Sequence, residues 1–177
     1  MADRVASHYS ENLKLADVIA QNLQSAGRDL NNLTTADLAT VDEFHIRGRK
    51  ATLELAAQMN LDTNSHVLDI GSGLGGPART VAETYGCQVT GVDLTQAFCN
   101  AATAMSEWVG LGKRVSFKQG DATNLPFDSK TFDAAMTMRG RKSRAGSPAP
   151  AASRVDISAR AKSAPAVSVY GAEQPGY

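Results

Sequence analysis

The sequence predicts an α/β protein built on an open parallel sheet. From His66 onward, short apolar runs alternate with helical stretches, which is the pattern of successive strand and helix units. A glycine-rich stretch, GSGLGG at 71–76, follows the first run, and Asp93 and Asp121 end the next two. Because ligands bind open α/β sheets at the carboxyl ends of their strands, these positions are predicted to form a site.

Helical stretches precede the sheet and are predicted to form a cap over residues 1–60. The first can begin at the capping residue Ser10, and its apolar residues recur at three- and four-residue steps. The second follows Thr35 and the third follows Gly48. Three side chains of this cap are candidates to face the site: His8, Tyr9 and His45.

Four strands and two helices are expected in the second region, residues 61–138. The strands are HVLDI, CQVTGVD, VSFKQGD and FDAAMTM. The helix after the first strand has Pro77 in its first turn and ends at Gly86, and the next helix begins at Thr95 and ends before Gly110. These signals fix the limits of both helices.

The third region, residues 139–177, has a different composition. Ala, Ser, Pro and Gly make up 23 of its 39 residues, and Leu and Phe are absent. Such a segment buries too little apolar surface to offset its ordering entropy, so it is predicted to be disordered. A basic arm for an anionic partner is the alternative, because the segment carries a net charge of +5.

Composition excludes several classes of protein. The 177 residues hold 18 Lys and Arg against 18 Asp and Glu, so a general nucleic-acid-binding protein is not expected. No apolar run reaches the length of a membrane-spanning helix, and no Cys or His cluster has the spacing of metal ligands. With two cysteines and no secretory signal pattern, the chain is predicted to be cytoplasmic, without disulfides or a metal.

Three carboxylates describe a ligand when they are taken together with the glycines. Asp93 can accept hydrogen bonds from a ribose diol, and Asp121 beside the Ala122 N–H can read the amino edge of an adenine. Asp69 lies just before the glycines, where a carboxylate suits an ammonium group better than a pyrophosphate. Ribose, adenine and a cationic amino-acid end describe S-adenosylmethionine. Solvated strand-end carboxylates around a structural turn are the simpler alternative.

The chain resembles the class I S-adenosylmethionine-dependent methyltransferases, in the small-molecule branch with the ubiquinone/menaquinone, sterol and sarcosine enzymes. Three blocks carry the resemblance, VLDIGSGLGGPAR at 67–79, GVDLT at 91–95 and GDATNLPFDSKTFD at 120–133, with a weaker one at 42–56. The resemblance implies a Rossmann-like fold, S-adenosylmethionine as cofactor and a small-molecule substrate. It places these residues at the cofactor: Asp69, Gly71, Ser72, Gly73 and Gly75 near the methionine part, Asp93 with Leu94 at the ribose, and Asp121 with Ala122 at the adenine.

The resemblance stops after Met138, where RGRKSRAGSPAP has the composition of a reading frame translated out of register. We therefore expect an incomplete fold with only the first four strands, produced by truncation or a frameshift. The fourth strand would then be an uncovered edge through which the chain associates with itself. Activity would be weak or lost, which leaves an inactive cofactor-binding fragment as one alternative and a nicotinamide-dependent oxidoreductase as another. The catalytic base and the methyl acceptor stay undefined.

Overall fold

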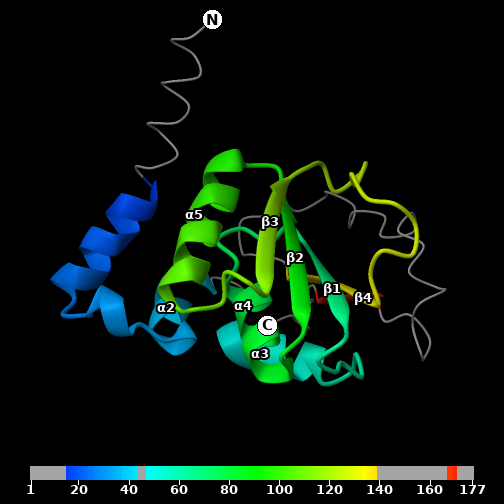
Figure 1. The fold of residues 1–177 in the computed structure, drawn as a ribbon, viewed down its shortest axis with the longest axis horizontal. Coiled ribbons are helices and arrows are strands. Elements are labelled where there is room, and N and C mark those ends of the chain that lie inside the picture. Colours follow the sequence, from blue (N-terminus) through cyan, green and yellow to red (C-terminus); the bar gives the residue numbers. More distant parts are fainter. Residues whose placement is uncertain (1–14, 44–46, 139–166, 171–177) are drawn as a thin grey trace, which may run out of the picture.

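A computed structural model describes residues 15–43, 47–138 and 167–170. Helical residues 15–25 come first, followed by the short 3-10 helix η1 (Leu30–Asn32), α2 (Thr35–Asp42) and α3 (Gly48–Ala56). Strands and helices then alternate through β1 (His66–Ile70), α4 (Gly76–Tyr85), β2 (Gln88–Asp93) and α5 (Gln96–Trp108), and β3 (Val115–Gln119), β4 (Ala134–Met138) and β5 (Val167–Tyr170) complete the order. The predicted α/β architecture is confirmed (Figure 1).

The strands form one parallel sheet in the order β3-β2-β1-β4-β5. The chain moves outward from β1 to β3 and then returns to the other side of β1 at β4, so the direction of strand order reverses between β1 and β4. A reversal of this kind opens a crevice at the carboxyl ends of the strands. The glycine-rich stretch follows β1 and therefore lies at this crevice.

Successive side chains of a strand point to opposite faces of the sheet, so the strands contribute to two hydrophobic clusters. Val67, Val89 and Met136 belong to one cluster, where α3 and α4 pack on the sheet. Leu68 and Phe132 belong to the cluster on the opposite face, which the loop between β3 and β4 helps to cover. The sheet is thus held by apolar contacts on both faces.

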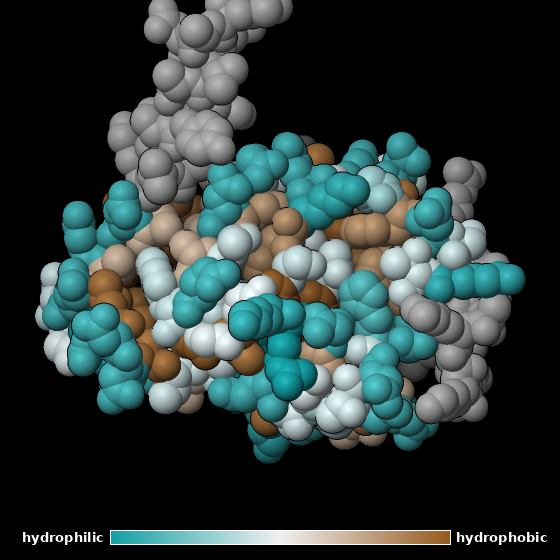
Figure 2. Space-filling view, in the orientation of Figure 1, coloured by the Kyte–Doolittle hydropathy of each residue, from teal (hydrophilic) through white to brown (hydrophobic). Residues whose placement is uncertain are grey.

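A third cluster joins helical residues 15–25 to α5 through Ala16, Ile19, Leu23 and Met105. In Figure 2, hydrophobic side chains gather at the left, over the part of the molecule that holds residues 15–25 and α2 in Figure 1. The predicted helical cap is confirmed for its described residues. No helix among the described residues is long and apolar enough to cross a membrane.

The four expected strands are present as β1 to β4, but β4 is not the edge of the sheet, so the expectation of an uncovered fourth strand is wrong. Residues 167–170 form β5, which pairs in parallel with β4 from Ala135 to Met138. The sequence VSVY has the β-branched and aromatic residues that favour a strand, and the ladder of β4 supplies the partner. Prediction of disorder over 139–177 is therefore wrong at these four residues, and the others of that range lie outside the described part of the chain.

Candidate cofactor site

The turn after β1 places two glycines against open space. Gly71 and Gly73 have φ values of +75° and +54°, which favour glycine, and nothing lies within 4 Å of a Cβ built on either residue. The N–H groups of Gly71 and Ser72 donate to the Val92 carbonyl at 2.8 and 3.0 Å, which ties the turn to the end of β2. A ligand can therefore approach this backbone closely.

Gly75 serves a different purpose. Its φ is +81°, and an added Cβ would lie 2.4 Å from the ring of Phe117 on β3. Gly91 on β2 receives the same ring, which would lie 2.5 Å from a Cβ there. The Phe117 ring thus fills the space that these two glycines leave, and it packs against the turn at Gly75.

Asp93 at the end of β2 links the turn to the loop before α5. One carboxylate oxygen accepts a hydrogen bond from Gly73 N at 2.9 Å, and the other accepts one from Thr95 N at 2.9 Å. A carboxylate offers about four acceptor positions, so each oxygen keeps a lone pair. The side chain is half-buried. It can bind a diol while its orientation is fixed by two backbone donors.

Asp69 is the most unusual group of the site. Its side chain is buried within β1, and neither carboxylate oxygen has a hydrogen-bond partner. Burial raises the pKa of this carboxyl to about 7, and the nearby charge of Asp93 adds to the effect. A buried carboxyl without a donor is costly unless a ligand supplies one. A cationic N–H group of a ligand is the kind of donor that fits the Asp69 carboxylate.

Asp121 and Ala122 follow β3 at the same edge of the sheet. The N–H of Gly120 donates to the Asp93 carbonyl at 3.0 Å, which holds the ends of β3 and β2 together. The exposed Asp121 carboxylate accepts hydrogen bonds from Thr123 N and Oγ1, and these bonds lower its pKa. Ala122 packs against the cluster beneath the loop.

Two apolar side chains stand exposed beside these carboxylates. Leu94, directly after β2, is 71% exposed, and Phe98 in the first turn of α5 is 39% exposed. Both side chains are apolar, yet neither is fully covered by the described part of the protein. Exposed apolar surface next to polar acceptors suits a ligand with a flat ring.

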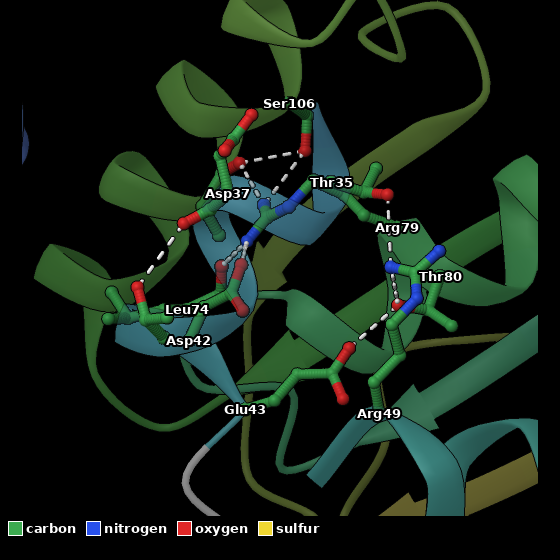
Figure 3. Close-up of polar contacts among 11 residues, drawn as sticks. Thr35, Asp37, Asp42, Glu43, Arg49, Leu74, Arg79, Thr80 and Ser106 are labelled. Carbon is green, nitrogen blue, oxygen red and sulfur yellow. Dashed lines mark hydrogen bonds and ion pairs between the residues drawn. The ribbon is translucent and has the colours of Figure 1, made fainter. Parts of the chain in front are cut away.

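Sequence reasoning missed a buried arginine behind the turn. Arg79 of α4 is 1% exposed, and its guanidinium donates to Asp42 at 2.6 Å, to the carbonyls of Leu74 and Ala102, and to Ser106 (Figure 3). Burial raises the pKa of Asp42 to about 6, although the Arg79 charge beside it acts to lower it. Arginine in a helix is usually a surface residue, so the sequence gives no signal of this burial.

Comparison with known proteins shows a similarity over the central part of the chain. Residues 67–147 match a family described as a methyltransferase domain. These residues are therefore similar to a methyltransferase domain. The match begins one residue into β1 and includes α4, α5 and every predicted cofactor residue.

Curated relatives of the methyltransferase domain differ in their acceptors. A sterol 24-C-methyltransferase of Gibberella zeae is 36% identical over 80 residues, 45% of this chain and 21% of the relative. Norajmaline N-methyltransferase of Rauvolfia serpentina is 41% identical over 73 residues, 41% of this chain and 25% of that enzyme. An O-methyltransferase of Aspergillus sclerotiorum is 28% identical over 99 residues, 56% of this chain and 38% of the relative. The chain therefore spans less than half the length of each.

Among solved structures, the [4+2]-cyclase SpnF is 35% identical with a TM-score of 0.48, covering 50% of this chain and 32% of the cyclase. A geranyl diphosphate methyltransferase in complex with SAM is 21% identical with a TM-score of 0.48, covering 50% of this chain and 36% of that enzyme.

The structure brings together most of the residues that the sequence nominates. Asp69, Gly71, Gly73 and Asp93 lie at the carboxyl ends of β1 and β2, where Gly73 donates to Asp93 and Gly71 donates to the Val92 carbonyl. Ser72 is buried against Gly91, and its hydroxyl has no hydrogen-bond partner. Three cap candidates, His8, Tyr9 and His45, lie outside the described residues.

Proposed function

We propose that the methyltransferase domain binds S-adenosylmethionine and belongs to an enzyme that methylates a small molecule. The observation that carries the proposal is Asp69, a buried carboxylate without a partner, next to a turn whose Gly71 and Gly73 leave open space. An amino-acid ammonium supplies the donor that this carboxylate lacks. A pyrophosphate would place negative charge against it, which disfavours a dinucleotide.

The other contacts follow the length of the same cofactor. Asp93 would accept hydrogen bonds from both ribose hydroxyls, since each of its oxygens keeps a free lone pair. Leu94 and Phe98 would pack against the adenine, and Asp121 with the Ala122 N–H would bind its polar edge. When bound, S-adenosylmethionine supplies an activated methyl group on a sulfonium. The chain's own residues orient that group and hold it in a fixed direction.

The acceptor is proposed only as a small molecule. The names of the relatives cover methylation at carbon, nitrogen and oxygen, so no atom is favoured. All the site residues argued above face the cofactor, and none is assigned to an acceptor. We propose that methyl transfer by this chain is weak or absent, which an S-adenosylhomocysteine release assay with sterol, amine and hydroxyl acceptors tests. A rate comparable with that of a full-length relative would refute this part.

A reducing, cytoplasmic compartment is part of the proposal. Cys87 and Cys99 are free and buried, so neither forms a disulfide. Burial raises the pKa of the Cys87 thiol to about 11, which keeps it protonated and unreactive. Localisation of a tagged chain by cell fractionation checks this directly.

Calorimetric titration with S-adenosylhomocysteine tests the cofactor assignment. The parent chain should bind, and Asp93→Asn should weaken binding at least tenfold because one ribose hydroxyl then meets an amide N–H. Asp17 lies on the exposed side of helical residues 15–25, far from Asp93 in the sequence. Asp17→Asn also removes one negative charge, and this variant should bind S-adenosylhomocysteine like the parent. Absence of binding to a folded parent, or displacement of the ligand by a nicotinamide dinucleotide at equal concentration, would refute the proposal.

A further inference from the structure

The Arg79 guanidinium contacts three separate parts of the chain. One nitrogen donates to the Leu74 carbonyl within the glycine turn and to the Asp42 carboxylate at the last residue of α2. The other terminal nitrogen donates to Ala102 and Ser106 on α5, at 3.0 and 3.1 Å. Figure 3 shows the guanidinium between Asp42 and Ser106. Turn, cap and α5 therefore meet at one side chain.

A second set of contacts fastens α2 to the same helix. The Glu43 carboxylate accepts a hydrogen bond from the Thr80 hydroxyl at 2.7 Å. Thr80 lies one turn after Gly76, the first residue of α4. A Cβ on Gly76 would lie 2.7 Å from the Asp42 carboxylate and 2.7 Å from the Glu43 side chain. The end of α2 thus rests directly on the first turn of α4, with no room for a side chain between them.

A short chain of bonds connects this junction to the ligand side of the turn. Asp93 holds Gly73 through its N–H, Leu74 is the next residue, and the Leu74 carbonyl is held by Arg79. The same nitrogen of Arg79 then reaches Asp42. A displacement of the turn between Gly73 and Gly75 moves the Leu74 carbonyl and, through its hydrogen bond, pulls on the Arg79 guanidinium. Asp42 accepts a hydrogen bond from the same nitrogen, so a shift of that nitrogen alters the Asp42 contact too.

We propose that Arg79 is a positioning residue that couples the cofactor turn to the end of α2, so that cofactor binding orders both together. This inference rests on the proposed function. The geometry needs an arginine, because a planar fork of donors reaches three directions at once, whereas a lysine ammonium is a single point. α2 is part of the helical cap, so the coupling reaches the cap.

Hydrogen exchange with and without S-adenosylhomocysteine tests the coupling. In the parent, the ligand should slow exchange both at the turn, residues 71–76, and along α2. In Arg79→Lys and Asp42→Asn, affinity should fall on the order of tenfold, and the ligand should protect the turn alone. Asp42→Asn preserves shape and size, so it carries the test where Arg79→Lys does not fold.

Glu83→Gln is the matched control. Glu83 pairs with Arg49 at 2.7 Å and accepts a hydrogen bond from Thr35 Oγ1 at 2.5 Å, so it joins α4 to α3 and to the start of α2 without touching the turn. Its variant loses one carboxylate from an arginine pair, as Asp42→Asn does, and it should keep both the parent affinity and the ligand-induced protection of α2.

Two results would overturn the inference. One is protection of α2 that persists in Arg79→Lys and Asp42→Asn, and the other is a loss of affinity no greater than in Glu83→Gln. Either result with a parent that binds S-adenosylhomocysteine refutes the coupling and leaves the proposed function standing. A folded parent that binds no S-adenosylhomocysteine refutes the proposed function itself, and the coupling to a cofactor with it.

Discussion

Replacing Asp69 by asparagine should remove a large pH dependence from the stability of the ligand-free chain. The carboxyl is buried without a hydrogen-bond partner, and its pKa is raised from 3.8 to about 7 by burial and then by the charge of Asp93. Below pH 3.8 the group is protonated in both folded and unfolded chains, so it costs nothing. As the pH rises toward 7, only the unfolded chain ionises it freely, and the folded state loses stability.

The size of the effect follows from the two pKa values. Each pKa unit corresponds to about 1.4 kcal/mol, so the difference between 3.8 and about 7 costs the folded state about 4 kcal/mol above pH 7. Asparagine has nearly the same shape and no charge, but it buries an amide whose unpaired donors cost about 1–3 kcal/mol. Asp69→Asn should therefore be more stable than the parent by about 1–3 kcal/mol at pH 8, and less stable at pH 4.

Urea denaturation of both chains at intervals between pH 4 and pH 8 provides the measurement. Other groups, including Asp42 with its pKa of about 6, titrate in both chains, so the difference between the two stability curves isolates Asp69. A difference that stays constant over this range would show that the carboxyl ionises normally, and the reasoning from its burial would then be wrong.

The same group gives a second readout when the ligand is added. An ammonium placed against Asp69 favours the ionised carboxylate, so S-adenosylhomocysteine binding at pH 6 should release about one proton from this residue. Calorimetry in two buffers of different ionisation enthalpy measures that release. Asp69→Asn should release none, and binding by the parent at pH 8.5 should release almost none from this site.

Three further changes test the packing around the site. Gly91→Ala places a Cβ against the Phe117 ring and should lower the free energy of unfolding by about 1–3 kcal/mol, part of which Phe117→Leu in the same chain should restore. Thr34→Ala removes the capping box of α2 and should cost about 1 kcal/mol in urea denaturation, with unchanged S-adenosylhomocysteine binding. Phe132→Ala empties a fully buried position between His66 and Phe127 and should cost about 3–5 kcal/mol, visible as a lower melting temperature.

Local signals were sufficient for most of the fold. The run HVLDI coincides with β1, and the glycine at 86 ends α4 in the left-handed conformation that a helix end favours. β5 could not be predicted in this way. Its four residues lie in a segment rich in Ala, Ser and Pro, and strand formation there depends on the free ladder of β4, about 30 residues earlier.

Residue types predicted which groups lie at the carboxyl edge of the sheet but not how they are held. Asp93 and the glycines were recognised because they follow strands, and strand ends meet at one edge of a parallel sheet. The bond from Gly73 to Asp93 joins residues of different loops, and the burial of Arg79 needs partners from α2, the turn and α5. Contacts of this kind depend on tertiary packing, which no local pattern in the sequence records.

The glycines of GSGLGG have different structural roles, which the motif alone does not reveal. Gly71 and Gly73 face open space, which suits a ligand that approaches the backbone. Gly75 leaves room for the ring of Phe117, and Gly76 leaves room for the end of α2. The first half of the motif therefore leaves space where the proposed cofactor would bind, and the second half packs against the protein. Because both halves lie within one turn, a change in the packing behind it alters the surface that the cofactor contacts, even where no cofactor-binding residue is replaced.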